Sequence, residues 1–326
     1  CLNYHINRCL APCMGYITKE EYKKQINEII DLLDGKTDKI IKELEKQMEE
    51  FVSLYQQEKN LEVISLGEKL LKNKPDDIEV MFGLANAYTN IDSMKQAIEL
   101  CNRILEIDST HYFSYQLLGV IHQIDSNYAK AIQYYLKVLS LRPTYASTYL
   151  NLGKIYETIP DKSEAIKCYL NAIDLFINHQ FYNKANELCY HVLQMDSTNS
   201  TAYTYWAKLF IENKEYEKAT EMLQFAINSN PSDAFAYLTL GKMCHDIGKH
   251  ENVALFLEQA IKCDSIYHSQ GFANQTDITL WAYLYLMDHY KVINETDKSK
   301  DYFHQAWVRD EEITKGYINY LGNESK

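Results

Sequence analysis

The sequence is poor in the residues that make tight turns and has no long apolar run. Its 326 residues include only 5 prolines and 11 glycines, too few for the many turns of a β-sandwich or barrel. No apolar stretch reaches the roughly 18 residues that suggest a membrane span, and no signal-peptide pattern is present. We therefore expect an all-α fold, no membrane segment and a cytoplasmic location.

Positive charge is also scarce. The 33 Lys and Arg residues face 45 Asp and Glu residues, which gives a formal net charge of −12. General affinity for nucleic acid would need a local basic patch working against this field, and the sequence contains no such patch. We expect no direct binding of nucleic acid by the main part of the chain.

Motifs of common enzyme sites are absent as well. The sequence contains no Gly-x-Gly-x-x-Gly, no Walker loop, no His-Glu-x-x-His and no Gly-x-Ser-x-Gly. The histidines are scattered, and we interpret His122, His245 and His289 as single polar residues on helix faces. We expect a protein that is not an enzyme. Five cysteines at apolar helix positions are expected to be buried, namely Cys101, Cys168, Cys189, Cys244 and Cys263.

A pattern of aromatic and small residues recurs every 34 residues. In-phase copies begin at residues 44, 78, 112, 146, 200, 234 and, more weakly, 280. An ordinary helical bundle would not preserve such a phase, so the pattern predicts a repeated pair of antiparallel helices. In the window 146–179 the pattern consists of Tyr149, Leu152, Gly153, Tyr156, Ala165, Tyr169 and Ala172.

This pattern resembles the tetratricopeptide repeat (TPR) over about residues 44–313. The resemblance implies a TPR α-solenoid, a right-handed superhelix of antiparallel helix pairs that binds another protein. Small residues at places eight and twenty let the two helices of a pair approach closely, and aromatic residues fill the space beside the next pair. We expect tight contacts at place eight, which Gly119, Gly153 and Gly241 occupy.

The repeat phase is broken twice. Between Ala165 and Ala185 it advances by only about 20 residues, so we expect one helix to be shared or unpaired there and the superhelix to bend. The segment Ile266 to Asp277 is an insertion that we expect to form an exposed loop. The predicted organisation is a cysteine-containing segment at 1–43, a TPR array of about seven units at 44–313, irregular near 165–200 and 266–279, and a capping helix with a tail at 314–326.

The first fifty residues carry a different signature. The chain opens with Cys1-Leu-Asn-Tyr-His-Ile-Asn-Arg-Cys-Leu-Ala-Pro-Cys13, followed by Ile17-Thr-Lys-Glu-Glu-Tyr22. These residues resemble the segment after the GIY-YIG domain in the UvrC subunit of the bacterial excision nuclease. The resemblance implies that Cys1, Cys9 and Cys13 belong to an iron–sulfur site whose fourth ligand lies upstream. Zinc held by the three cysteines and His5, or reduced thiols without a metal, are the alternatives.

The UvrC-like pattern stops soon after residue 50. In that family the next element is a helical hairpin that binds the UvrB helicase subunit, whereas here the segment 50–57 enters the repeat phase. The helix at about 38–57 is expected to be the first helix of the first repeat. Neither nuclease domain of the family is visible in these residues. A role as an accessory piece of a UvrC-like excision repair subunit, or a junction of two unrelated genes, remains an alternative to the scaffold.

The TPR resemblance also implies where a partner binds. In TPR folds the first helix of each pair lines the concave groove, and places two, five, nine and twelve point into it. Lysine recurs at place nine, which predicts a positive strip between apolar pockets and favours an acidic or carboxylate-ended peptide. Ordinary solvated lysines are the alternative. The candidate residues are Asn86, Lys154, Lys208 and Lys242 at place nine, Phe82, Leu150 and Leu238 at place five, and Phe113 and Phe235 at place two.

Overall fold

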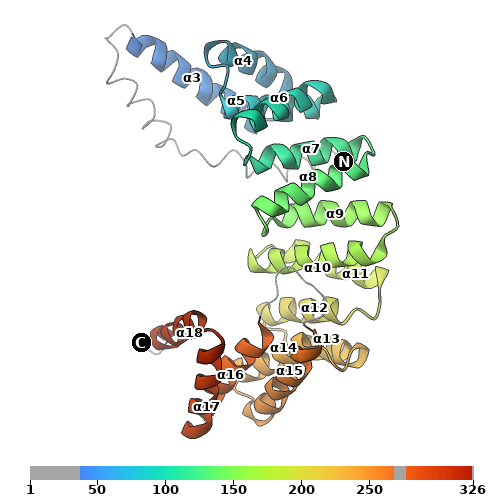
Figure 1. Cartoon of the computed structure of the whole chain (residues 1–326), viewed down its shortest axis with the longest axis vertical. Helices are drawn as coiled ribbons and strands as arrows, with labels where there is room; N and C mark the ends of the chain where they lie inside the picture. Colours follow the sequence, from blue (N-terminus) through green and yellow to red (C-terminus); the bar gives the residue numbers. More distant parts are fainter. Residues whose placement is uncertain (1–36, 268–276, 325–326) are drawn as a thin grey trace. The chain divides into compact units, whose positions relative to one another are not determined.

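A computed structural model describes residues 37–267 and 277–324, and within these residues the chain is all-α, with sixteen α-helices, one short 3-10 helix and no β-strand (Figure 1). The predicted TPR α-solenoid is confirmed as the fold class. The helices are α3 Thr37–Gln56, α4 Asn60–Asn73, α5 Ile78–Asn90, α6 Met94–Ile107, α7 Tyr112–Ile124, α8 Tyr128–Leu141, α9 Ala146–Thr158, α10 Lys162–Asn178, α11 Tyr182–Met195, α12 Ser200–Glu212, α13 Tyr216–Ser229, α14 Ala234–Asp246, η2 His250–Asn252, α15 Val253–Tyr267, α16 Ile278–Val292, α17 Thr296–Arg309 and α18 Glu311–Glu324.

The chain forms two compact units, Cys1–Thr148 and Tyr149–Lys326. In the first unit α3 packs on α4, α5 on α6 and α7 on α8. In the second unit α10 packs on α11, α12 on α13, α14 on α15 and α16 on α17. Each unit is therefore built from helix pairs that are consecutive in sequence, as the 34-residue phase predicts.

The first helix of most pairs begins at a capping side chain. At α14, the Asp233 Oδ1 atom accepts a hydrogen bond from the Ala236 N–H at 3.0 Å. Such a cap satisfies a backbone donor that has no partner inside the helix. The corresponding caps are Asp77 of α5, His111 of α7, Asn199 of α12 and Asp277 of α16.

The turn inside most helix pairs contains a residue in the left-handed conformation. Asp92 and Ser126, which are 34 residues apart, have φ angles of 61° and 57°. Only one of these positions is a glycine, Gly248, with a φ of 72°. The shape of the turn therefore recurs with the repeat even where the residue type does not favour it. The other such turn residues are Glu58, Gln180, Lys214 and Asn294.

Glycine at place eight removes a clash between the two helices of a pair. A Cβ atom on Gly119 would lie 2.5 Å from Cε1 of Tyr135, closer than packed carbon atoms can approach. The predicted tight contacts are present. The same close approach joins Gly153 to Tyr169 and Gly241 to Leu257.

Helix α10 is buried on almost every side, and its ten buried residues run from Ala165 to Ile177. Its Tyr169 lies against Gly153 of α9, and the helix also packs on α11 and α12. It therefore acts as the second helix for α9 and as the first helix for α11. This double use accounts for the phase advance of about 20 residues, while the bend that we expect there stays a prediction.

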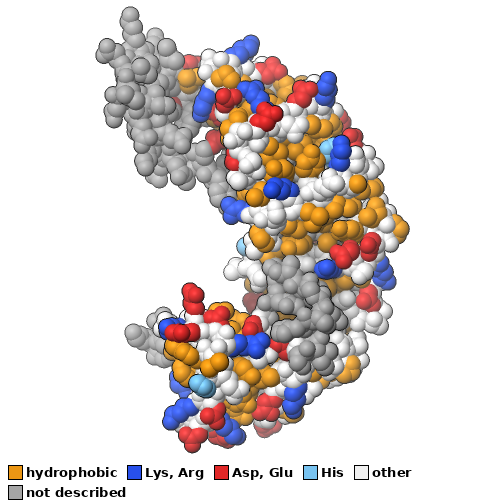
Figure 2. Space-filling view, viewed as in Figure 1, with side chains coloured by type: hydrophobic (Ala, Val, Ile, Leu, Met, Phe, Trp, Pro, Cys, Tyr) orange, Lys and Arg blue, Asp and Glu red, His pale blue; other side chains and the backbone are white. Residues whose placement is uncertain are grey.

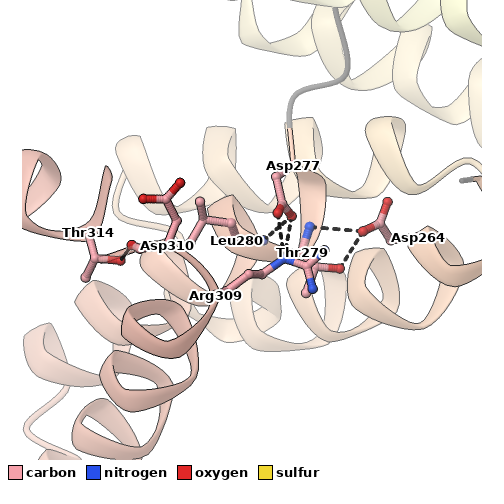
Figure 3. A network of polar contacts seen from close by, with 7 residues as sticks. All are labelled: Asp264, Asp277, Thr279, Leu280, Arg309, Asp310 and Thr314. Carbon is pink, nitrogen blue, oxygen red and sulfur yellow. Dashed lines mark hydrogen bonds and ion pairs between the residues drawn. The ribbon is translucent and has the colours of Figure 1, made fainter. Parts of the chain in front are cut away.

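Polar contacts hold the helices on either side of the insertion (Figure 3). The buried Asp264 carboxylate on α15 accepts hydrogen bonds from the backbone N–H of Thr279 at 3.2 Å and from its hydroxyl at 2.5 Å. The Nε atom of Arg309 on α17 donates to both oxygens of Asp277, at 2.7 and 2.6 Å. The prediction of a loop from Ile266 is wrong for its first two residues, because α15 continues through Tyr267. Residues 268–276 lie outside the described part.

Helix α3 is part of the first helix pair. Its Phe51 is only 1% exposed, and a Cβ atom on Gly83 of α5 would lie 2.7 Å from the Phe51 ring. The helix that follows the UvrC-like residues is thus packed into the repeat array. No helix in residues 37–267 and 277–324 is long and apolar enough to cross a membrane.

Candidate partner-binding site

In the first unit the predicted site residues belong to an aromatic cluster. The ring centroids of Phe82 on α5 and Phe113 on α7 lie 6.0 Å apart, and His111 lies 5.3 Å from Phe82. The rings of Tyr112 and Tyr145 extend the cluster, with centroids 5.7 Å apart. Phe82 is buried, whereas the other four are half-buried. The cluster is therefore partly exposed at Phe113 and the tyrosines, and Phe82 belongs to the core.

Asn86 does not project from this surface. It is only 2% exposed, and its Nδ2 atom donates to the Phe82 carbonyl oxygen of its own helix at 2.8 Å. Nearby in the same unit, the Thr148 hydroxyl donates to Oε1 of the buried Gln116 at 2.7 Å. Place nine of this repeat is thus filled by an amide that packs inside the unit, and direct contact between Asn86 and a partner stays a prediction.

In the second unit Lys208 of α12 lies between two rings and a carboxylate. Its Nζ atom is 5.5 Å from the centroid of Tyr205 and 5.3 Å from the centroid of Phe235 on α14, distances at which a cation is attracted by a ring face. The Asp174 Oδ1 atom of α10 lies 3.9 Å away. Burial lowers the pKa of Lys208, and Asp174 and then Glu212 oppose that effect. The ammonium group is therefore held in place by attraction from several sides.

Lys242 of α14 repeats this arrangement one helix pair later. Its Nζ atom lies 2.5 Å from Oδ2 of Asp246 and 5.7 Å from the ring centroid of Tyr285 on α16. In both cases a lysine at place nine of one first helix reaches over an aromatic ring of the next first helix. We call Lys208, Phe235, Lys242 and Tyr285 the lysine–ring ladder.

The remaining predicted site residues of the second unit are not part of the ladder. Leu238 of α14 is buried in the core. On α9, Leu150 is half-buried and Lys154 is exposed. The three lysines are therefore not equivalent, because Lys208 and Lys242 are each paired with a carboxylate of this chain.

The sequence prediction missed the carboxylates that accompany the ladder. Asp246 follows Lys242 by four residues on one helix, a spacing that brings opposite charges together and was available as a signal. Asp174 lies on α10, 34 residues before Lys208, so the repeat length was available as a signal once α10 is counted as the first helix of its pair with α11. The predicted strip is thus a set of ion pairs over rings rather than a row of unpaired positive charges.

The interpretation of isolated histidines is wrong for two of the three. The ring centroids of His245 on α14 and His289 on α16 lie 6.4 Å apart. They are 44 residues apart in sequence, so only the stacking of neighbouring helix pairs brings them together. His122 does lie on its own helix face, where its ring stacks on Tyr134 with centroids 5.5 Å apart.

The cysteines of the predicted metal site, Cys1, Cys9 and Cys13, lie outside the described residues, as does His5. Within residues 37–267 and 277–324, no group of three or more His, Cys, Asp or Glu side chains is arranged to hold a metal ion. The five other cysteines are unpaired thiols, and all but the half-buried Cys244 are buried as expected.

Comparison with known families agrees with this architecture. Residues 78–111 and 146–176 match a tetratricopeptide repeat model, and residues 126–159 match a TPR repeat model. The chain contains tetratricopeptide repeats. Residues 1–32 match the middle domain of the UvrC/Cho excinuclease, so two family signatures stand in one sequence.

The chain is similar to UvrABC system protein C over a short stretch at its N-terminal end. The UvrABC system protein C of Clostridium novyi is 51% identical over 71 residues, which cover 22% of this chain and 11% of that protein. That of Dictyoglomus thermophilum is 55% identical over 51 residues, covering 16% of this chain and 8% of that protein. The match therefore spans only a small part of these relatives.

The solved structures to which the chain is similar include a MamA protein and part of a TPR repeat-containing protein. MamA of Desulfovibrio magneticus RS-1 is 14% identical with a TM-score of 0.38, covering 58% of this chain and 96% of that one. Part of a TPR repeat-containing protein of Cytophaga hutchinsonii is 15% identical with a TM-score of 0.36, covering 83% of this chain and 98% of that one.

Proposed function

We propose that this chain is a protein-binding scaffold that holds an acidic peptide segment of its partner along the lysine–ring ladder. The repeats support the general role, since TPR arrays stack helix pairs into an extended binding surface. The observation that carries the specific proposal is the repetition of one geometry. Lys208 and Lys242 stand at the same place of successive repeats and reach over Phe235 and Tyr285.

The ion pairs within the chain leave N–H donors of both lysines available to a ligand. An ammonium group has three N–H donors, and one carboxylate oxygen uses only one of them. The Lys208 Nζ atom is 3.9 Å from Asp174, beyond good hydrogen-bond distance, and Lys242 pairs with Asp246 at an exposed site. A peptide carboxylate would thus add to each pair while apolar side chains of the peptide rest on the rings.

The test begins with selection from a displayed library of random peptides on the immobilised chain. A selected peptide is then labelled, and its affinity is measured by fluorescence anisotropy at low and moderate salt. The double variant Lys208→Gln and Lys242→Gln is expected to bind at least about tenfold more weakly, with less dependence on salt. Selected peptides without acidic residues would contradict the proposal.

A matched control is present in the same unit. The Lys218 Nζ atom lies 5.5 Å from the Phe210 ring centroid and 2.5 Å from Glu215, but Lys218 belongs to α13, the second helix of its pair. Lys218→Gln removes the same kinds of contact outside the proposed surface and should change the affinity less than about twofold. Equal loss in the control and the double variant would move the binding site away from the ladder.

The match of residues 1–32 to the UvrC middle domain favours a second candidate, an accessory role in excision repair. In this reading Cys1, Cys9 and Cys13 hold a cluster together with an upstream ligand. A version of the protein that includes the upstream coding sequence, purified without oxygen, should show iron–sulfur absorbance that Cys9→Ala abolishes. Recovery of zinc alone, or of no metal, would reject the cluster.

A further inference from the structure

Three histidines from three elements meet in the second unit. His245 is in the last turn of α14, His250 is in η2, and His289 is in the last turn of α16. Their ring centroids are 6.2 Å apart for His245 and His250, 6.4 Å for His245 and His289, and 5.6 Å for His250 and His289. His289 is only 2% exposed. The cluster thus sits where α14 and η2 pack beside α16.

The charged groups around the cluster sum to zero when one histidine, His245, is protonated. The His245 Nε2 atom is 3.3 Å from Oδ2 of Asp288, and its Nδ1 atom is 3.6 Å from Oδ1 of Asp246. Asp246 also pairs with Lys242. Two cations, Lys242 and protonated His245, therefore face two carboxylates. Other titratable groups near the cluster are Tyr285 and Tyr290 of α16, Glu295 after α16 and Tyr317 of α18.

A second positive charge among the three histidines would have no further negative charge to balance it. The His250 Nδ1 and His289 Nδ1 atoms are buried and have no hydrogen-bond partner, so neither imidazole has an acceptor waiting for an added proton at that atom. A second imidazolium would stand about 6 Å from the first in a poorly hydrated site, where like charges repel strongly. Burial, and then His250 and His245, lower the pKa of His289, which agrees with this geometry.

We propose that the cluster of His245, His250 and His289 is a pH-responsive latch between α14 and α16. With one proton, on His245, the latch is closed, because that imidazolium draws Asp288 of α16 toward α14. Protonation of His289 in mild acid opens it by repulsion, because its imidazolium then stands about 6 Å from that of His245, while Lys242 and His245 already balance Asp246 and Asp288. The latch does not depend on the proposed function, although Lys242 of the ladder shares Asp246 with it.

The test is hydrogen exchange of α16 in the full chain at pH 7 and pH 5, corrected for the intrinsic effect of pH on exchange. The wild type is expected to exchange about tenfold faster in α16 at pH 5, while α12 changes little. The double variant His250→Gln and His289→Gln should lose most of this pH response. His304→Gln, a change of an exposed histidine on α17, should keep it.

A second measurement does not depend on the folding of any variant. Titration of the wild-type histidines by NMR should show His245 protonated at neutral pH and His289 accepting a proton only below pH 6.5. Protonation of both histidines at neutral pH, or an unchanged pH response in the double variant, would overturn the latch.

Discussion

The two units of the chain use the same helix pair to present different surfaces. In the first unit, place nine holds Asn86, which is buried and bonded to its own helix, and the half-buried surface beside it consists of rings such as Phe113. In the second unit, place nine holds Lys208 and Lys242, which reach out over rings of the next pair. The comparison shows that the small and aromatic residues determine how the helices pack. The residue at place nine can differ between repeats, and it changes the charge and polarity of the surface. On the face drawn in Figure 2, hydrophobic side chains gather over α7 and α8 of the first unit.

The largest expected effect comes from breaking the packing that both units share. Gly119→Leu in the first unit and Gly153→Leu in the second should each lower the free energy of unfolding by about 1–3 kcal/mol, because the new side chain meets a tyrosine ring. Urea denaturation measures this. Gly316 on α18 has no atom near its would-be Cβ, so Gly316→Ala should instead stabilise by about 0.5–1 kcal/mol. An unchanged midpoint for both leucine variants would refute close packing at place eight.

The second prediction concerns the polar contacts around the insertion in the second unit. Thr279→Val removes a hydroxyl donor from the buried Asp264 carboxylate and should cost about 1–3 kcal/mol. Arg309→Gln breaks the more exposed pair with Asp277 and should cost less than about 1 kcal/mol. Thermal denaturation measures both effects. A greater loss of stability in Arg309→Gln than in Thr279→Val would show that the Arg309–Asp277 pair, and not the Thr279–Asp264 hydrogen bond, is the main stabilising contact.

A smaller effect of opposite sign in the two units is expected from their histidines. Burial lowers the pKa of His111 in the first unit, against the attraction of Asp108. The unfolded chain then binds more protons in mild acid, so this stabilisation is present above pH 6.5 and is lost as the pH falls. Asp246 and Asp288 raise the pKa of His245 in the second unit to about 9. Its contribution is complete below pH 6.5 and is lost as the pH rises toward 9.

The measurement compares unfolding of the wild type with His111→Asn, which keeps a capping side chain, and with His245→Gln. The difference between wild type and His111→Asn should shrink from pH 7.5 to pH 5, and the difference for His245→Gln should shrink from pH 6 to pH 9.5. Parallel curves for both variants would show that neither histidine is linked to folding.

Much of the fold could be predicted from the sequence because the residues that pack two helices together recur at fixed places in each repeat. The glycines at place eight and the aromatic residues at place twenty-four identify which helices pair, and both Tyr135 and Tyr169 stand where the repeat puts them. The turns were harder to see, since most left-handed positions carry residues such as Asp92 rather than glycine. The start of the chain, with Cys9, lies outside the described residues, and its predicted metal site stays a prediction.

The candidate site was predicted only in part. Place nine led to Lys208 and Lys242, and a count of 34 back from Lys208 also reaches its carboxylate partner Asp174 on α10, the helix used twice. No such count joins His245 and His289, which meet because helix pairs stack, with an insertion between them in sequence. Contacts within one repeat follow from its pattern, whereas contacts across an irregular junction depend on how the pairs stack.

The most direct test of the account is to find where a bound peptide lies. A selected peptide that carries a photoreactive phenylalanine analogue is cross-linked to the full chain, and the attached residues are identified by mass spectrometry. The account predicts cross-links on α12, α14 and α16, beside Lys208, Lys242 and Tyr285. Cross-links confined to the second helices α13 and α15, or to the first unit, would contradict it.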